Sequence, residues 1–257
     1  MIFHKIMNCI FIIFRLSRLI YIKTPILKYN TIDTDIIGTP HSIASWNIQG
    51  LWIYLHIWKM DNIIYYLSQF NTDVICLQEV FEDSIKLQII NIMKNKYPYY
   101  LIGNTDKKFT VCEDSGLLVL SKYKIDFKQE IVFDNCIFPD NLSNKSALYF
   151  TIGDINIVMT HLQDSKPIYT GNNISKDQLM SIKNNTLFKE YLLVGDLNNE
   201  EICSYYQIPP NNSIATCGNK IIDYILPIHM NSDYNINIYD IRLPDTSDHS
   251  PIIAHLV

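Results

Sequence analysis

The stretch Asp73-Val-Ile-Cys-Leu-Gln-Glu-Val80 decides the fold, because four consecutive apolar residues are followed at once by two polar ones. A short uninterrupted apolar run is typical of a strand that is buried on both faces of a sheet. Glu79 therefore comes just after a buried strand, where a carboxylate has to be paired or has to face a cleft. Taken alone, Glu79 is better explained by an interaction with the N-terminus of a following helix.

Strand-like and helix-like segments alternate on either side of this stretch. Hairpin strands, one pair of them joined by Gly153-Asp154, dominate the second half of the chain. This order predicts an α/β domain with mixed sheets and not a doubly wound parallel sheet. Helical spacing of apolar residues predicts helices at 53–70, 81–93 and 175–188, the last with Ser175 as a candidate N-cap. Apolar or alternating runs predict further strands at 43–48, 116–120, 131–133, 147–152, 155–160, 191–194, 221–226, 236–241 and 252–256.

Composition narrows the class of protein. The 257 residues are 48% apolar and 18% charged, which suits a globular protein with a sizeable core and excludes a disordered one. The net charge of -5, with scattered lysines, argues against a long nucleic-acid substrate, because such proteins usually carry a basic surface. The six cysteines show no CxxC and no metal-ligand spacing, so we expect an intracellular, reducing compartment.

The first 40 residues differ from the rest. Residues 6–14 form an apolar run that is followed by Arg15 and Arg18. The run is far shorter than the roughly 20 residues that span a bilayer, and no cleavage site follows it, so a signal peptide is not expected. A helix that docks on the domain, an interfacial helix and a signal anchor remain as alternatives. The polar residues 29–40 predict a linker, which gives an N-terminal segment and linker at 1–40 and a catalytic domain at 41–257.

Polar residues capable of chemistry fall at or near the ends of predicted strands throughout the chain. A rigid sheet presents a site in this way, by bringing strand ends together. Each residue alone has an ordinary explanation: Asp223, for example, can be a satisfied core carboxylate and His161 a hydrogen-bonded core histidine. Their shared placement favours one common site. The residues are Asn47, Glu79, His161, Asp196, Asn198, Asp223, Asp248 and His249.

The residue types in this set fit the hydrolysis of a phosphate ester. Carboxylate and amide oxygens select Mg2+ or, as an alternative, Mn2+, and the set holds no soft ligands for zinc. The metal would polarise a phosphoryl oxygen and stabilise the leaving oxygen. A histidine held by a carboxylate can take a proton from water near neutral pH. A second histidine and an asparagine can donate hydrogen bonds to the charge that develops in the transition state.

Seven blocks stand in a fixed order along the chain: Ser45-Trp-Asn-Ile-Gln-Gly50, Asp73-Val-Ile-Cys-Leu-Gln-Glu-Val80, Ser115-Gly-Leu-Leu-Val-Leu-Ser121, Thr160-His-Leu-Gln163, Gly195-Asp-Leu-Asn198, Ile222-Asp-Tyr-Ile-Leu226 and Ser247-Asp-His-Ser-Pro251. Together they resemble the blocks of the endonuclease/exonuclease/phosphatase superfamily, and the match runs from about residue 43 to the C-terminus. The ordered set is highly specific, whereas each block alone is not. The resemblance implies a DNase I-like fold, a four-layer α/β sandwich of two mixed β-sheets flanked by helices.

The resemblance also implies a metal site. Glu79 would be the main ligand for Mg2+, assisted by Asn47, and Asp248 would hold the metal or the neighbouring histidine. Gln49 departs from the pattern, because several nuclease branches have an acid at this position. A glutamine makes a nuclease-type second metal contact doubtful.

The remaining site residues receive catalytic roles by resemblance. His249 would be the general base for the attacking water, and Asp223 and Asp248 would hold its orientation. Asp196 would position the nucleophile. The phosphoryl oxygens would be held by Asn198 and His161.

Three details resemble the neutral sphingomyelinase-like branch: Phe81 after Gln78-Glu-Val80, Gln163 after His161-Leu162, and the stretch Asn144-Lys-Ser-Ala-Leu-Tyr149. Lys145 would contact a headgroup phosphate, or else lie at the surface. An aromatic wall at the membrane, or ordinary core packing, would explain Trp52, Tyr54 and Trp58.

A lipid headgroup is therefore the favoured substrate over nucleic acid. The expected protein is a monomer, with peripheral membrane contact through residues 1–28 as a further expectation. The alternatives are a DNA-directed enzyme of the same fold, either a tyrosyl-DNA phosphodiesterase or an abasic-site endonuclease, and a catalytically inactive scaffold. The stretch between Asn198 and Ile221 is short and rich in Asn and Pro, which indicates trimmed loops near the site.

Overall fold

The structure is a computed structural model of the whole chain. Predictions for the apolar segment at 1–27, and for Trp52, Tyr54 and the side chain of Trp58, lie outside the residues that it describes. The described residues are 28–30, 32, 35–51, 57–104, 113–138, 140–164, 174–208, 214–230, 234–238, 243 and 245–256.

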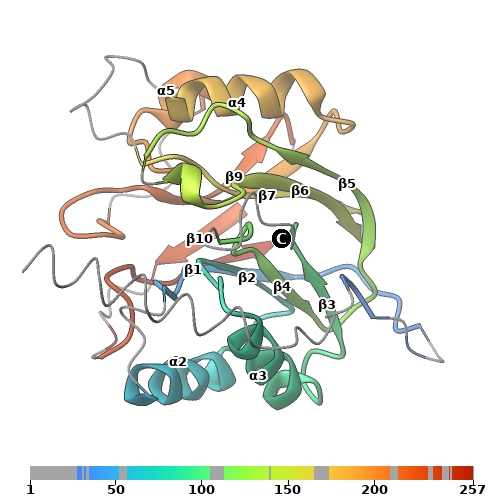
Figure 1. Cartoon of the computed structure of the whole chain (residues 1–257). Coiled ribbons are helices and arrows are strands. Elements are labelled where there is room, and N and C mark those ends of the chain that lie inside the picture. The colour runs from blue at the N-terminus through green and yellow to red at the C-terminus, as the bar shows by residue number, and fades with distance from the viewer. Residues whose placement is uncertain are drawn as a thin grey trace, which may run out of the picture.

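Two mixed β-sheets lie face to face at the centre of the protein (Figure 1). The first has the strand order β10-β11-β1-β2-β4-β3 and the second the order β5-β6-β7-β8-β9. The β1–β2 and β7–β8 pairs are parallel and the other pairs are antiparallel. The first sheet consists of β1 (Ser42–Asn47), β2 (Val74–Gln78), β3 (Tyr99–Ile102), β4 (Leu118–Ser121), β10 (Tyr234–Ile238) and β11 (Ile252–Leu256). The second consists of β5 (Asp126–Val132), β6 (Ser146–Ile152), β7 (Ile155–His161), β8 (Tyr191–Asp196) and β9 (Asp223–Ile228).

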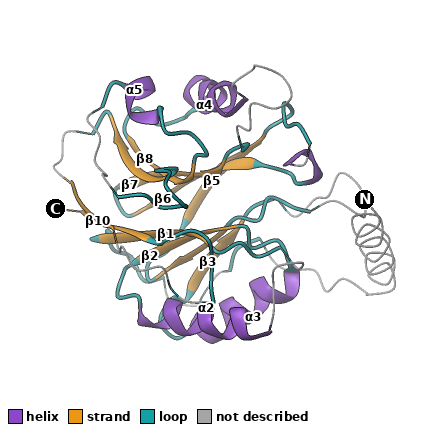
Figure 2. Cartoon of the chain, turned by 90° about the vertical axis from the view of Figure 1, so that its left-hand side faces the viewer, coloured by secondary structure: helices purple, strands orange, loops and turns teal. Residues whose placement is uncertain are grey.

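Helices cover the outer faces of both sheets (Figure 2). The helices α2 (Ile57–Gln69) and α3 (Asp83–Met93) lie on the first sheet, and α4 (Ile174–Asn185) and α5 (Ile202–Tyr206) lie on the second. A short 3-10 turn, η1 (Asp140–Leu142), precedes β6. The predicted four-layer α/β sandwich is therefore confirmed. Within the described parts of the chain, every helix is too short or too polar to cross a membrane.

The stretch at residues 73–80 shows why apolar runs produce this architecture. Successive side chains of a strand point to opposite faces of the sheet. Val74 and Cys76 accordingly lie in the core between the two sheets, whereas Ile75 and Leu77 pack under the helices of the first sheet. A strand that is covered on both faces needs an unbroken apolar run, as the sequence has here.

The second sheet differs in part from the prediction. Strand β5 begins at Asp126, five positions before the predicted start at Ile131, because it is an edge strand whose exposed face carries charged residues that hide the apolar pattern. Ser175 lies inside α4, which begins at Ile174, so its predicted role as the N-cap is wrong. The predicted strand at 236–241 overlaps β10, and residues 239–242 lie outside the described part. Strand β3, η1 and α5 were not predicted.

The predicted linker and Lys28 just before it contact the rest of the chain. The Lys28 carbonyl oxygen accepts a hydrogen bond of 2.8 Å from the Ile102 amide, and Asp35 forms an ion pair of 2.5 Å with Lys124. Tyr29 forms an isolated bridge with Leu101 of β3. The chain from Lys28 onward thus includes contacts with the catalytic domain.

A buried ion pair between α3 and the loop before β4 supplies a test of stability. Lys86 and Asp114 are 2.5 Å apart, and their side chains are 0% and 1% exposed. We expect Lys86→Met to lower the free energy of unfolding by about 3–5 kcal/mol, because it leaves the Asp114 carboxylate buried without its cation. Urea denaturation measures this value. In the matched control Lys128→Met, which removes an exposed ion pair with Asp126, the loss should stay below about 1 kcal/mol; equal losses would contradict the prediction.

Candidate active site

The polar residues flagged in the sequence gather at one edge of the sandwich. Strands β1, β2, β7 and β8 end at this edge, and the antiparallel strands β9 and β11 start there. The first sheet and its loops supply Asn47, Glu79 and His249, and the second sheet supplies His161, Asp196 and Asp223. The site is therefore assembled from both sheets.

A close approach of two strands places His161 beside Asp196. The parallel strands β7 and β8 pair Thr160 with Gly195 and His161 with Asp196. Gly195 has a φ of 139°, and a Cβ atom there would lie 1.9 Å from the Thr160 carbonyl oxygen. Only glycine fits this position, and the residue that follows it is the site carboxylate.

Asn47 links the two halves of the site. It is fully buried, and its Nδ2 donates hydrogen bonds of 3.0 Å to Glu79 Oε1 and 2.9 Å to Asp196 Oδ2. His161 Nε2 lies 3.6 Å from the same Asp196 oxygen and 3.9 Å from Glu79 Oε1. Two carboxylates from different sheets thus converge on one amide and one imidazole.

His249 is fixed by both its ring and its backbone. Its Nδ1 lies 2.8 Å from Asp223 Oδ2, and its Nε2 lies 3.7 Å from Asp196 Oδ2. The indole of Trp46 donates a hydrogen bond of 3.0 Å to the His249 carbonyl oxygen. The Ser247 hydroxyl donates to the Asn47 carbonyl oxygen at 2.6 Å and accepts from the His249 amide at 3.1 Å. Asp223 therefore orients the ring so that Nε2 faces the other carboxylates.

Three residues that follow strands at the site have a left-handed backbone. The φ angles are 50° for Gln49, 58° for Glu79 and 48° for Asn198. This conformation is uncommon for residues other than glycine, and such strain concentrates at functional sites. The backbone of Asn198 is held by its amide, which donates to Asp196 Oδ1, and its side chain donates to the Leu162 carbonyl oxygen.

Burial alters the protonation of the site. It raises the pKa of Glu79, and together with the nearby Asp223 charge it raises the pKa of Asp196 to about 7. Burial, with the charges of Lys145 and His249, holds the pKa of His161 well below its usual range. Burial would also lower the pKa of His249, but the charge and hydrogen bond of Asp223 outweigh it and raise that pKa to about 12.

These residues fit a divalent cation. The donors are mainly carboxylate and amide oxygens, which are the ligands that Mg2+ and Mn2+ prefer. Burial raises the pKa of Glu79 and Asp196, so a bound cation would favour the charged forms that burial disfavours. Two buried atoms, Asp223 Oδ1 and His161 Nδ1, have no hydrogen-bond partner among the described residues. Asp196, Asp223 and His249 each offer one ligand atom, and these three atoms lie within 4.8 Å of one another, close enough to share a cation.

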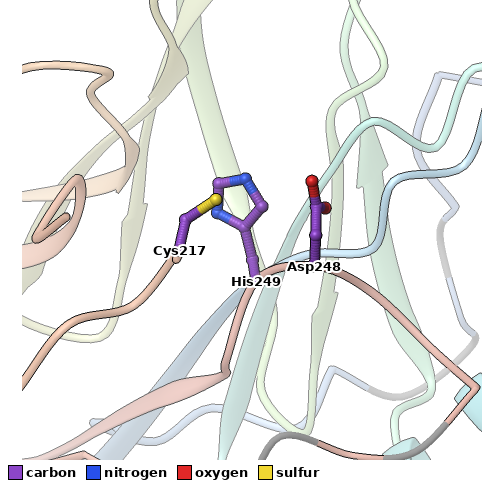
Figure 3. Close-up of side chains that lie close together, drawn as sticks. All are labelled: Cys217, Asp248 and His249. Atoms are coloured by element: carbon purple, nitrogen blue, oxygen red, sulfur yellow. The ribbon is translucent and has the colours of Figure 1, made fainter. Parts of the chain in front are cut away.

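Asp248 differs from the buried carboxylates in its exposure. Its side chain is exposed, and its Oδ1 lies 3.5 Å from the Ser247 hydroxyl. The carboxylate bonded to the His249 ring belongs to Asp223. Cys217 lies beside the same ring (Figure 3). No sequence pattern points to Cys217, because it comes from a loop far from Asp248 along the chain.

Two buried lysines complete the surroundings of the site. Lys145 is 2% exposed, and its Nζ donates a hydrogen bond of 2.9 Å to the Leu162 carbonyl oxygen, so it is not a surface lysine. It contributes positive charge that acts on Glu79, His161 and Asp196. Lys59, which the sequence analysis did not single out, donates to the carbonyl and side-chain oxygens of Gln49 at 3.0 and 2.8 Å. Both lysines were hard to interpret because nothing in the sequence shows that they are buried.

Comparison with known proteins identifies the family to which this chain belongs. A model of the endonuclease/exonuclease/phosphatase family matches residues 44–249, which include every residue of the site. The chain belongs to the endonuclease/exonuclease/phosphatase family. Among curated members, it is 31% identical over 157 residues to a sphingomyelinase C of Bacillus cereus. That match covers 51% of this chain and 47% of the relative, so the chain spans about half the length of the curated relative it matches.

Several solved structures have the same fold. The structure of SmcL has a TM-score of 0.68 at 20% identity and covers 85% of this chain and 99% of that one. A magnesium-bound beta toxin of Staphylococcus aureus has a TM-score of 0.60 at 18% identity and covers 85% and 100%. The TDP2 structure from C. elegans has a TM-score of 0.57 at 19% identity and covers 87% and 77%.

The contact between Asp223 and His249 gives a prediction about protonation. In the metal-free protein we expect Asp223→Asn to lower the pKa of His249, because the variant removes the largest of the interactions that raise it and leaves the burial that lowers it. An NMR titration of the imidazole resonances measures this change. Asp154→Asn, an exposed substitution in the β6–β7 turn, is the matched control and should leave the titration unchanged. A His249 titration that is the same in Asp223→Asn as in the wild type would contradict the assigned contact.

Proposed function

We propose that this chain is a Mg2+-dependent phosphodiester hydrolase that acts on a phospholipid headgroup, as a sphingomyelinase-like enzyme. The observation that carries the proposal is the pairing of two features at one edge. One is the Glu79–Asn47–Asp196 cluster, which suits a hard cation. The other is His249, whose Nδ1 is held by Asp223 while its Nε2 faces that cluster.

The metal would be held by Glu79, with Asn47 beside it. A bound divalent cation would polarise a phosphoryl oxygen, stabilise the leaving oxygen and, by its charge, lower the pKa of His249 towards the range in which the ring accepts a proton. The fit of the donor set and the bound magnesium ions of the beta toxin structure both support this choice.

The other residues act on water and phosphate. His249 Nε2 takes a proton from the attacking water, while Asp223 keeps the proton of Nδ1 in place. Asp196, which lies 3.7 Å from Nε2, accepts a hydrogen bond from the same water and positions it. His161 and Asn198 donate to the phosphoryl oxygens as charge develops. Asp248, at the exposed side of His249, borders the entrance.

A lipid substrate is supported by several observations. The curated relative with 31% identity is named a sphingomyelinase C. The net charge of -5 does not suit a phosphate polymer. Phe81 and Gln163, which resemble the sphingomyelinase-like branch, are both buried in the structure, where Gln163 Nε2 donates a hydrogen bond of 2.8 Å to Asp140. Because they are buried, we do not expect either side chain to contact the substrate directly.

A DNA-directed enzyme is the second candidate, because the TDP2 structure shares the fold. A panel of three substrates separates the candidates: sphingomyelin in vesicles, a duplex with an abasic site, and DNA with a 5′-tyrosyl adduct. We expect Mg2+-dependent hydrolysis of sphingomyelin and little of the others. Hydrolysis of DNA alone would overturn the lipid assignment, and hydrolysis of none of the three would favour an inactive scaffold.

We further propose peripheral membrane contact through residues 1–28, on the basis of their apolar run and flanking arginines. The truncation that tests this should remove residues 1–27 and keep Lys28, whose carbonyl oxygen bonds the Ile102 amide. We expect the truncated chain to co-sediment less with sphingomyelin-containing vesicles and to keep its activity on detergent-dispersed substrate. Equal co-sedimentation of the full and truncated chains would remove this role.

A further inference from the structure

Cys217, Asp248 and His249 form a cluster at the exposed side of the site. The three come from two separate segments, yet one ligand atom from each lies within 4.8 Å of the others. Figure 3 shows the Cys217 sulfur on one side of the His249 ring and the Asp248 carboxylate on the other. Cys217 is half-buried and Asp248 exposed, so the cluster is open to solute from outside.

The backbone around Cys217 is held in place from two directions. The Ser250 amide donates a hydrogen bond of 2.8 Å to the Thr216 carbonyl oxygen, and Cys217 forms an isolated antiparallel bridge with His249. On the other side, the Thr216 hydroxyl accepts hydrogen bonds of 3.2 Å from the Ile222 and Asp223 amides. The Cys217 backbone is therefore held beside that of His249, which places the thiol and the imidazole close together.

The chemistry of this cluster differs from that of the Glu79 site. Thiolate, imidazole and carboxylate are together the ligands of Zn2+, whereas Mg2+ prefers oxygen alone. Zinc is bound at about 2.0–2.3 Å from each ligand atom, and three ligand atoms within 4.8 Å of one another are close to that arrangement. A further oxygen is nearby: Asp223 Oδ1 is buried without a hydrogen-bond partner among the described residues, and Asp223 is bonded to the same imidazole.

We propose that Cys217, Asp248 and His249 form a second, inhibitory site for a thiophilic divalent cation such as Zn2+. On binding, the Cys217 thiol loses its proton to solvent and the sulfur takes one coordination position of the metal. A nitrogen of His249 takes another. If that nitrogen is Nδ1, the bond to Asp223 is lost; if it is Nε2, the atom proposed to accept the proton is blocked. The inhibition rests on the function proposed for His249, whereas the binding does not.

Cobalt tests the binding without any assay of activity. The reduced, metal-free full chain is titrated with Co2+, and thiolate-to-cobalt charge-transfer absorption is recorded. We expect this absorption in the wild type and in the control Cys203→Ser, which changes another half-buried thiol, on α5. We expect none in Cys217→Ser. Absorption that persists in Cys217→Ser, or that is absent from the wild type, would overturn the proposal.

Asp248→Asn supplies a second variant in case Cys217→Ser does not fold. Because Asp248 is exposed, this change should leave the fold intact. We expect the cobalt absorption to remain and the affinity for Zn2+, measured by displacement of Co2+, to fall by about tenfold or more. An unchanged affinity would exclude Asp248 from the site and overturn the three-ligand proposal.

Inhibition is measured on the Mg2+-saturated protein with its confirmed substrate, as the ratio of rates with and without Zn2+. We expect the Zn2+ concentration for half-inhibition to rise by at least about tenfold in Cys217→Ser relative to the wild type. Equal inhibition of both proteins would place the inhibitory ion at the Glu79 cluster and overturn the proposal. Failure of the proposed function is distinguishable, because it would leave the cobalt spectrum intact and give no hydrolysis at all.

Discussion

Replacing His249 with alanine is expected to lower kcat by about a hundred- to ten-thousandfold, the usual contribution of a positioned general base. The variant removes the Nε2 atom that faces Asp196 at 3.7 Å, and no other described imidazole in the cluster is a comparable proton acceptor. Among the described histidines, the one other member of the cluster is His161, and its pKa is lowered by burial behind Glu79 and Asp196. Steady-state hydrolysis at saturating Mg2+ measures the effect.

The control for this substitution is His255→Ala, which changes an exposed histidine on β11, the strand that follows His249 in the chain. It should leave kcat within the error of the measurement. Affinity of His249→Ala for Mn2+ should stay close to that of the wild type, which separates loss of the base from loss of the metal. Wild-type rates in His249→Ala on a confirmed substrate would show that the site is assigned wrongly.

Glu79→Ala is expected to abolish Mg2+-dependent hydrolysis and to weaken cation binding by at least about a hundredfold, because it removes the main charged ligand proposed for the metal. Glu79→Gln separates charge from shape, since glutamine keeps the length of the side chain and the left-handed backbone at this position. Both variants should show the same loss of affinity if the carboxylate charge is what binds the cation. Isothermal titration with Mn2+ measures the affinity independently of activity.

Glu190→Gln is the matched control, because it removes a glutamate charge at an exposed position before β8. We expect its affinity for Mn2+ and its rate to match those of the wild type. If Glu79→Gln bound Mn2+ as tightly as the wild type, the metal would lie elsewhere and the role of Glu79 would be structural.

Much of the fold follows from the sequence because the strands are buried on both faces. Such strands need unbroken apolar runs, and β2 and β8 were predicted for this reason. An edge strand with an exposed face does not need an unbroken apolar run. The start of β5 was missed because Asp126 and Lys128 are exposed there and a β-bulge between Phe127 and Gln129 interrupts the alternation of the strand.

The site was predictable to the extent that it lies at strand ends. Asn47, Glu79, His161 and Asp196 all stand at or directly after predicted strands, and the structure brings them together. Contacts between loops leave no such pattern. The sequence offered both Asp223 and Asp248 as partners of His249, and only the fold shows that Asp223 makes the ring contact. The contact of Cys217 with His249 could not be predicted either, because it depends on how the Thr216 backbone pairs with Ser250.

The bridge made by Asn47 has a consequence for how the protein responds to disturbance of its interior. Of the two carboxylates that the Asn47 amide binds, Glu79 follows a strand of the first sheet and Asp196 ends a strand of the second. The distance between them therefore depends on the spacing between the sheets. That spacing is set by the layer of side chains that includes Val74, Met159 and Val194. Interiors are close-packed and transmit strain, so a change of volume in this layer moves the two carboxylates relative to one another. Apolar substitutions in the core between the sheets should therefore change the catalytic rate, although they alter no polar residue of the active site.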